Sequence, residues 1–284
     1  MNPLKEKIKA GKAICGTHVQ LSDPAICEIY GQLGYDYIWL DSEHSTLSFR
    51  EIYNSLNAAN LRGTPVVVRV PQDDLTFTKK VLEMGPDGII FPMVNTPEEA
   101  NRLIGYTLYP PYGNRGCGPM RAVLYGGIGL KEYTSEEHLD ICRFIQIESR
   151  MAIENLEKIA ENPYIDGFVF GPVDLSGSLG CLTEVLDENG ETQKWMRKAI
   201  SILKAKGKYI GISYGDTRPE VIKHWHDMGI NMISVGSDFG YLYEQGKKAL
   251  ETLRSVHAPR QITNKVCISN AKMRLICTPC FVDF

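Results

Sequence analysis

Short apolar runs alternate with segments of helical spacing along most of the chain. Eight of these runs are rich in valine, isoleucine and aromatic residues, which favour strands; they are residues 12–19, 35–41, 64–70, 87–94, 143–148, 165–171, 208–213 and 230–236. Because long crossovers separate consecutive runs, the strands are expected to pair in parallel. Eight such units predict a closed (β/α)8 TIM barrel of the α/β class rather than an open doubly wound sheet.

The segments between the runs carry apolar residues at every third or fourth position, as expected for one face of a helix. Thr96 followed by Pro97 predicts a helix start, and Gly34 predicts a helix end. The segment before residues 143–148 is the weak link, because a long loop and a short helical stretch replace one clean helix. The first strand is not followed by GxGxxG, so the sequence gives no support to a dinucleotide-binding fold.

Composition and charge narrow the classes of function. The chain has 284 residues, a net charge of −3 and 43% hydrophobic residues, which is typical of a globular protein without a general basic surface. The N-terminal residues include no apolar signal core, and no apolar stretch is long enough to span a membrane. We therefore expect a cytoplasmic protein that binds neither nucleic acid nor membranes. The barrel is expected over residues 1–253, followed by a C-terminal extension, residues 254–284, that packs on another subunit or is partly disordered.

The eight cysteines are scattered and form no compact disulfide framework. Cys277 and Cys280 form a CxxC sequence, but a structural zinc site needs a second pair of ligands, and only Cys267 lies near. Free thiols are therefore the favoured interpretation of this pair, with zinc as the weaker alternative.

Polar residues collect where the predicted strands end. A TIM barrel carries its active site at the carboxyl ends of its strands, so residues from separate segments meet there. The candidate residues at this rim are Asp41, Glu43, His44, Arg69, Gln146, Glu148 and Asp174.

The residue types at the rim suggest particular chemistry. Arg69 ends an apolar run, where a buried guanidinium needs an anion. Glu148 and Asp174 come from neighbouring strands and offer hard oxygen ligands, which suit Mg²⁺ or Mn²⁺ better than zinc. Asp41 and His44 could form a carboxylate-oriented imidazole, which is a common general base.

Simpler interpretations stay open for these residues. Asp41 could cap the next helix, Asp174 could be an N-cap, and Glu148 could serve only as an ion-pair partner of Arg69. His138 lies in an acidic segment and is expected to be solvated.

The loop at residues 109–125, "YPPYGNRGCGPMRA" and the residues after it, is rich in proline and glycine. It is either a rigid crossover or a substrate-facing lid or subunit contact. In the second case Arg115 and Arg121 would supply charge for binding an anion.

Several motifs in order resemble the HpcH/HpaI aldolase family of metal-dependent class II pyruvate aldolases. The motifs are "LGYDYIWLDSEHS", "VVVRVP", "GIIFPMVNTPEEA", "YPPYGNRGCGPMRA", "IQIES" and "GFVFGPVDLSGSLG". The resemblance covers residues 4–253. It implies a TIM barrel of the phosphoenolpyruvate/pyruvate type that reversibly cleaves a 4-hydroxy-2-oxo acid to pyruvate and an aldehyde. It also implies a homo-oligomer, with a hexamer favoured, in which the last helix packs on a partner.

The resemblance also implies roles for single residues. Glu148 and Asp174 would bind the divalent metal, which would be Mg²⁺ or Mn²⁺, with Co²⁺ as a third candidate. Gln146 would support this site, and the backbone amides of Val173 and Asp174 would hold the pyruvate carboxylate. The remaining roles fall to the other rim residues: the enolate would be stabilised by Arg69, and the base, oriented by Asp41, would be His44.

Two positions depart from the pattern of the family. His18 stands where the family usually has tryptophan, and Glu83 replaces an aspartate at a position implicated in the base network. Both changes bear on the choice of substrate more than on the type of reaction. The rival interpretations are an acyl-CoA lyase of the citramalyl or malyl type, which would need a basic cleft for the CoA phosphates, and a non-catalytic barrel subunit.

Overall fold

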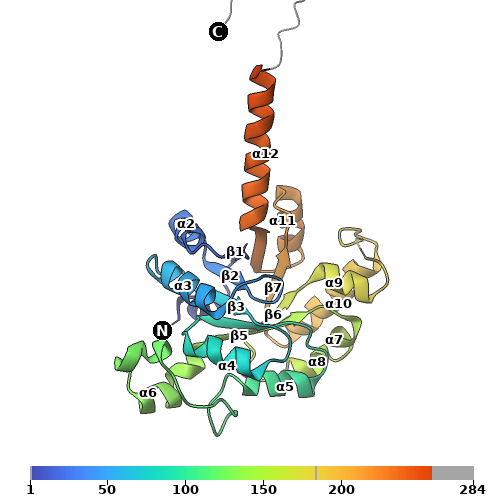
Figure 1. Cartoon of the computed structure of the whole chain (residues 1–284). Helices are drawn as coiled ribbons and strands as arrows, with labels where there is room; N and C mark the ends of the chain where they lie inside the picture. Colours follow the sequence, from blue (N-terminus) through green and yellow to red (C-terminus); the bar gives the residue numbers. More distant parts are fainter. Residues whose placement is uncertain (1, 183, 258–284) are drawn as a thin grey trace, which may run out of the picture. The chain divides into compact units, whose positions relative to one another are not determined.

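The computed structural model describes residues 2–182 and 184–257 and consists of a closed barrel of eight parallel strands, which confirms the predicted (β/α)8 fold (Figure 1). Each strand pairs in parallel with the next one in the sequence, and β8 pairs with β1 to close the barrel. The strands are β1 (Ile14–Val19), β2 (Tyr37–Asp41), β3 (Val66–Arg69), β4 (Gly88–Phe91), β5 (Cys142–Ile147), β6 (Gly167–Phe170), β7 (Tyr209–Tyr214) and β8 (Met232–Ser237). The predicted CxxC sequence and most of the predicted C-terminal extension lie outside the described residues.

Helices follow the strands and cover the outside of the barrel, except for α1, which precedes β1. The principal helices are α1 (Pro3–Lys9), α2 (Ala25–Leu33), α3 (Phe49–Asn60), α4 (Leu75–Glu83), α5 (Pro97–Gly105), α6 (Leu130–Ser135), α7 (Arg150–Glu154), α8 (Leu156–Ile159), α9 (Pro172–Ser178), α10 (Glu191–Ala205), α11 (Pro219–Asp227) and α12 (Asp238–His257). Two short 3-10 turns, η1 (Arg121–Gly126) and η2 (Glu137–Asp140), occupy the segment that the sequence marked as irregular. Thr96 caps α5 through a capping box, as predicted.

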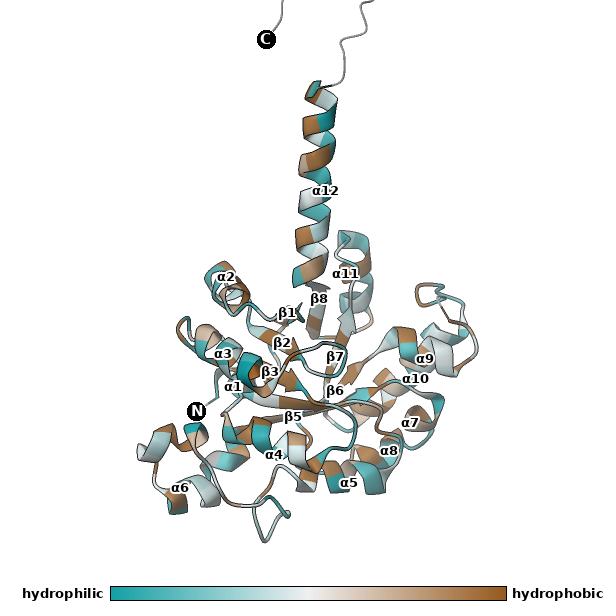
Figure 2. Cartoon of the chain, in the orientation of Figure 1, coloured by the Kyte–Doolittle hydropathy of each residue, from teal (hydrophilic) through white to brown (hydrophobic). Residues whose placement is uncertain are grey.

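Side chains alternate along each strand between the inner and the outer face of the barrel, and this produces two apolar layers. One parity of each strand packs outward against the helices, for example Ile38, Val68 and Ile145. The other parity fills the barrel interior, and its apolar members form a separate cluster that includes Trp39 and Phe144. In Figure 2 the strands are mainly brown and the helices mix brown and teal, as this layering requires. Polar side chains that share the inward parity near a strand end therefore project into the mouth of the barrel.

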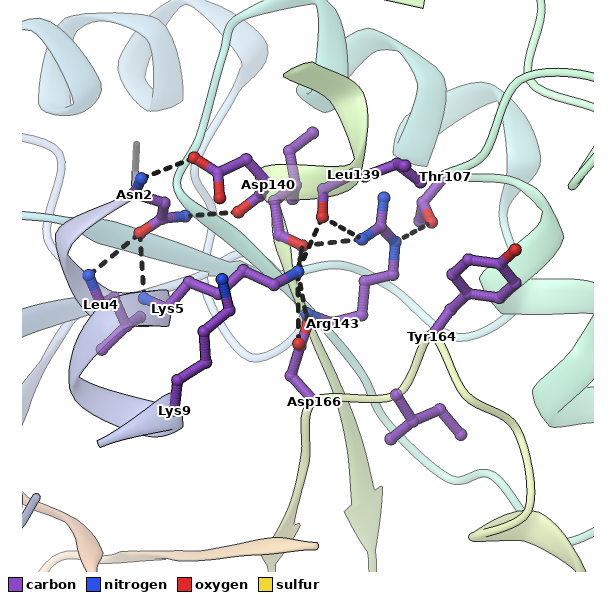
Figure 3. Close-up of polar contacts among 12 residues, drawn as sticks. Asn2, Leu4, Lys5, Lys9, Thr107, Leu139, Asp140, Arg143, Tyr164 and Asp166 are labelled. Atoms are coloured by element: carbon purple, nitrogen blue, oxygen red, sulfur yellow. Dashed lines mark hydrogen bonds and ion pairs between the residues drawn. The ribbon is translucent and has the colours of Figure 1, made fainter. Parts of the chain in front are cut away.

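The amino-terminal end of the barrel is closed by polar contacts between α1, η2 and β5 (Figure 3). Lys5 Nζ donates to the carbonyls of Leu139 and Ile141 at 2.7 and 3.2 Å. Arg143 is fully buried and donates from Nε to Thr107 Oγ1 at 2.6 Å and from Nη1 to Ile141 O at 2.8 Å. The polar groups at this end of the barrel are thus engaged in hydrogen bonds that hold the fold together.

His138 corrects one expectation from the sequence. Its side chain is fully buried rather than solvated, and its ring packs edge-on against Tyr109 with 5.1 Å between centroids. Burial lowers the pKa of His138. The acidic sequence around it suggested solvent, but η2 turns this one side chain inward.

The contacts divide the chain into two units, Met1–Glu244 and Gln245–Phe284, so that the boundary falls within α12. Among the described residues, no helix combines the length and the apolar character needed to cross a bilayer.

Candidate active site

Two neighbouring strands bring an arginine and a carboxylate together at the mouth of the barrel. In the β2–β3 register Asp41 lies beside Arg69. Arg69 Nε donates to Asp41 Oδ1 at 3.0 Å and Nη2 donates to Oδ2 at 2.5 Å, which is a bidentate pair. The third nitrogen, Nη1, lies 3.1 Å from Glu43 Oε2. These contacts hold Arg69 rigidly. The two carboxylates are the anions that the buried guanidinium was predicted to need.

Electrostatics keep this pair ionised although both side chains are buried. Burial alone would raise the pKa of Asp41, but hydrogen bonds and charge from Arg69 bring it below its ordinary value. Burial alone would lower the pKa of Arg69, but the bonds and charge of Asp41 raise it. A fixed positive charge is thus present at the mouth of the barrel.

The predicted pairing of the Asp41 carboxylate with the His44 ring is wrong. Asp41 Oδ1 accepts from the backbone N–H groups of Glu43 and His44 at 3.0 and 3.2 Å, so it caps the turn and not the imidazole. The next helix, α3, is capped by Ser48 and not by Asp41. The His44 ring is 62% exposed, and its Nε2 lies 3.8 Å from Glu43 Oε2. Glu43 is therefore the carboxylate that faces both the imidazole and Arg69.

A second carboxylate is held at the mouth of the barrel by β5. Glu148 follows β5 directly and is buried. Its Oε1 accepts from Gln146 Nε2 at 2.5 Å and its Oε2 from the backbone N–H of Met93 at 2.8 Å. Burial raises the pKa of Glu148 to about 7; the N–H of Met93 opposes this rise, and the charges of Glu43 and Asp174 add to it. The simpler interpretation of Glu148 as only a partner of Arg69 is wrong, since Arg69 is paired with Asp41 and Glu43.

A glycine makes room for this carboxylate. Gly171 directly follows β6 as the N-cap of α9, and a Cβ at this position would lie 2.6 Å from Glu148 Oε1 and 3.0 Å from Gln146 Nε2. Only glycine therefore fits this position without displacing the two side chains. Asp174 lies in the first turn of α9, whose N-cap is Gly171, so Asp174 is not the N-cap itself.

The residues around Glu148 fit a hard divalent cation. Gln146 Oε1 is buried and has no hydrogen-bond partner, and burial, together with the charges of Glu43 and Asp174, raises the pKa of Glu148, so a bound cation would stabilise its ionised form. Across residues 2–182 and 184–257 no group of three or more histidine, cysteine or acidic side chains converges on one point. The protein would therefore offer few carboxylates and leave positions for water and substrate, as Mg²⁺ sites commonly do.

The loop at residues 109–125 uses its two arginines within the chain. Arg115 is 2% exposed, lies 3.5 Å from Glu83, and stacks on the ring of Tyr109 at 4.7 Å. Arg121 donates to Asn57 Oδ1 at 2.8 Å and to a carbonyl at the end of α4. These contacts favour the rigid-crossover interpretation of the loop. Glu83 lies beside Arg115, and burial raises its pKa.

The structure adds residues that the sequence did not single out. Gln20 follows β1 and donates from Nε2 to Asp41 Oδ2 at 3.0 Å and to the carbonyl of His44 at 3.2 Å. Met93 has a left-handed backbone, with φ of 53°, which points its N–H at Glu148. The glycine at 171 was a usable signal, because it stands directly before a proline that opens a helix. His18, which stands where the family usually has tryptophan, lies inside the mouth with its ring packed on Trp39.

The comparisons with known proteins agree with this geometry. The family model described as HpcH/HpaI aldolase/citrate lyase matches residues 15–244. The 2-keto-3-deoxy-L-rhamnonate aldolase of Escherichia coli (strain K12) is 32% identical to this chain over 241 residues, which cover 84% of this chain and 87% of that protein. An HpcH/HpaI aldolase from Desulfitobacterium hafniense DCB-2 has a TM-score of 0.83 at 28% identity, covering 92% of this chain and 99% of that one. An HpcH/HpaI aldolase/citrate lyase family protein from Burkholderia cenocepacia J2315 has a TM-score of 0.82 at 27% identity, covering 89% and 100%.

Proposed function

We propose, from the premise that this chain belongs to the HpcH/HpaI aldolase/citrate lyase family, that it is a divalent-metal-dependent aldolase. It reversibly cleaves a 4-hydroxy-2-oxo acid to pyruvate and an aldehyde. One observation carries the proposal: the guanidinium of Arg69, held by Asp41, and the buried carboxylate of Glu148, held by the N–H of Met93, lie at the same barrel mouth. This arrangement can hold an α-keto acid and a cation together.

The cation would be held by Glu148 and Asp174, supported by Gln146, which bonds Glu148 through Nε2 and leaves its Oε1 without a partner. When bound, Mg²⁺ or Mn²⁺ would act as a Lewis acid on the 2-oxo and carboxylate oxygens of pyruvate. The first turn of α9 leaves its backbone N–H groups without helical partners, so the amides of Val173 and Asp174 can receive the pyruvate carboxylate.

Arg69 supplies the positive charge where negative charge develops. When the bond between C3 and C4 breaks, its electron pair moves toward the C2 oxygen and forms the enolate of pyruvate. The guanidinium is buried and preorganised by Asp41, so little reorganisation is needed as this charge appears. Asp41 thus acts on the reaction by positioning Arg69.

His44 removes the proton from the C4 hydroxyl, directly or through a water molecule, as the aldehyde forms. The ring is exposed at the mouth, where it can exchange its proton with solvent. Glu43 lies 3.8 Å from the ring and stabilises the imidazolium that the transfer creates. In this scheme Glu43 takes the role that the sequence suggested for Asp41.

The structure weighs against the two rival functions. An acyl-CoA lyase needs a basic cleft for phosphates, and the two loop arginines that could form one, Arg115 and Arg121, are bound within the chain. A non-catalytic barrel would need no charged groups at its mouth, yet Arg69 and Glu148 are held there by specific bonds.

We also propose a homo-oligomer, in which a hexamer is favoured by the resemblance. A groove of about 540 Å³ runs along the outside of β1 and β8 beside α11, and most of its lining is apolar, including Ile14, Ile222 and Ile233. Several apolar side chains of α12 are exposed, among them Leu242 and Val256. Both features suit a partner subunit.

A cytoplasmic location is part of the proposal as well. Cysteines 15, 27, 117, 142 and 181, the ones in the described residues, are all unpaired. This supports a reducing compartment.

The test is a screen of pyruvate with a panel of aldehydes in the presence of Mg²⁺, Mn²⁺ or Co²⁺, followed by chromatography of the 4-hydroxy-2-oxo acid. Arg69→Ala should lower kcat/KM by roughly a hundredfold or more, as loss of a charge-stabilising donor does. Arg197→Ala, at an exposed arginine on the outer helix α10, is the matched control and should retain full activity. Product formation that EDTA leaves unchanged would refute the metal-dependent mechanism.

A further inference from the structure

A buried histidine at the barrel mouth has no role in the scheme above. His18 is 9% exposed and lies on the inward parity of β1. Its ring packs on Trp39 at 5.1 Å between centroids, and the guanidinium of Arg69 lies over the same indole at 5.4 Å. His18 therefore borders the same mouth as Arg69, with Trp39 between them.

A bulge in β8 aims a carbonyl at this ring. In the β1–β8 register Gly16 pairs with Ser234, but His18 pairs with Ser237, so β8 carries one extra residue here. Gly236 takes up the bulge with a left-handed backbone, φ of 66°. Its carbonyl oxygen lies 2.7 Å from His18 Nδ1. Bulges of this kind often re-aim groups beside active sites.

This carbonyl fixes the tautomer of His18. A carbonyl oxygen can only accept, so Nδ1 must carry the proton. Burial, together with the charge of Arg69, lowers the pKa of His18 to about 4, although the nearby carbonyl and the charges of Asp41 and Asp238 oppose this shift. The ring is therefore neutral near pH 7, and its Nε2 has a lone pair and no proton.

The fixed tautomer in turn orients a serine. Ser213 Oγ lies 2.8 Å from His18 Nε2, so its hydroxyl must donate to that nitrogen. Ser213 is on the inward parity of β7, because the next residue, Tyr214, packs outward on Trp225. Ser213 is partly exposed, so a ligand in the mouth can reach its oxygen. Because its one proton is donated to His18, this oxygen offers the ligand lone pairs only.

We propose that the His18–Ser213 pair selects the aldehyde substrate: Ser213 Oγ accepts a hydrogen bond from an aldehyde hydroxyl, so hydroxyaldehydes are favoured over aldehydes that bear a carboxylate at the same position. The inference rests on the proposed aldolase function. A carboxylate would need Ser213 to turn its proton toward the ligand. That rotation would leave the buried Nε2 of His18 without a donor, which is unfavourable.

The experiment compares kcat/KM for addition of pyruvate to three aldehydes: lactaldehyde, propionaldehyde and succinic semialdehyde, each with saturating Mn²⁺. The wild type should favour lactaldehyde. Ser213→Ala should lower kcat/KM for lactaldehyde by about five- to tenfold, the loss expected for one neutral hydrogen bond, and leave the value for propionaldehyde within twofold. His18→Phe should act in the same direction, and His18→Gln, whose amide oxygen can accept from Ser213, should restore the preference.

His224→Gln is the matched control, because this histidine bonds Gln193 on the outer helices and should not alter the preference. Equal losses on lactaldehyde and propionaldehyde in Ser213→Ala would overturn the inference, as would a wild-type preference for succinic semialdehyde. Absence of product from the wild type with every aldehyde would instead overturn the proposed function itself. Circular dichroism of each variant shows whether it is folded, and the two His18 substitutions give an answer even if one of them is not.

Discussion

Acid should destabilise this protein through His18. The ordinary pKa of a histidine is 6.5, and in the folded chain burial lowers that of His18 to about 4. Between these values the unfolded chain binds a proton at this residue and the folded chain does not. The neutral ring therefore contributes stability that is present above pH 6.5 and is lost as the pH falls toward 4.

The magnitude follows from the size of the shift. The two pKa values differ by about 2.5, so the free energy of unfolding should be lower by about 3 kcal/mol once the pH has fallen to about 4. That is a large part of the stability of a typical domain. Other groups titrate in the same window, so the prediction concerns the difference between the wild type and His18→Gln, in which their contributions cancel.

The assay is urea unfolding followed by circular dichroism at about pH 7.5 and about pH 4.5. The unfolding free energy of the wild type minus that of His18→Gln should be about 2–3 kcal/mol smaller at about pH 4.5 than at about pH 7.5. His224→Gln serves as the control, and the advantage of the wild type over it should change by less than about 0.5 kcal/mol. If the difference between wild type and His18→Gln is the same at both values, His18 is not held neutral in the fold and the argument from its tautomer fails.

Three further outcomes are expected from the site. Gly171→Ala should weaken Mn²⁺ binding, measured by calorimetry, because the added Cβ would lie 2.6 Å from Glu148 Oε1. Unchanged affinity would contradict the argument that glycine is needed here to leave room for Glu148. Asp41→Asn should lower the unfolding free energy by about 3 kcal/mol, because it leaves the buried charge of Arg69 beside a neutral side chain in place of its bidentate carboxylate. The value of kcat should fall as well. A fully active, fully stable variant would contradict the proposal that Asp41 holds Arg69 in position. His44→Ala should change stability by less than about 0.5 kcal/mol, because the ring is exposed, and should lower kcat by about a hundredfold or more; full activity would exclude it as the base.

The barrel and its inward-facing residues could be predicted because strand side chains alternate with a period of two. That rule alone places Arg69 on the same face as Val67, and Gln146 on the same face as Glu148. It also places Asp41 beside Arg69 once neighbouring strands are paired in register. The rim was thus accessible from the sequence.

The partners of the rim residues could not be predicted, because they depend on turn geometry and not on alternation. The order of Asp41, Glu43 and His44 in the sequence does not say which carboxylate faces the ring. The turn after β2 directs backbone N–H groups, and not the imidazole, at Asp41. The left-handed backbone of Met93 and the bulge at Gly236 are equally local, and both decide which group meets a buried side chain.

The loop arginines show the same limit. Arg115 is charged and lies in a loop, which left open a role in binding an anion, but its guanidinium lies over the rings of Tyr109 and Tyr133. Burial of such a side chain depends on what the crossover folds against, and no pattern within the loop itself reports that.

Exchange of the methyl protons of pyruvate for deuterium, followed by proton NMR without any aldehyde, tests the central claim most directly. The measurement isolates enolate formation at the site of Arg69 and Glu148 from the choice of the second substrate. The account predicts exchange that requires Mg²⁺ or Mn²⁺, stops with EDTA, and falls at least about a hundredfold in Glu148→Gln. Exchange that persists at the wild-type rate in EDTA or in Glu148→Gln would contradict a metal-assisted enolate at this site.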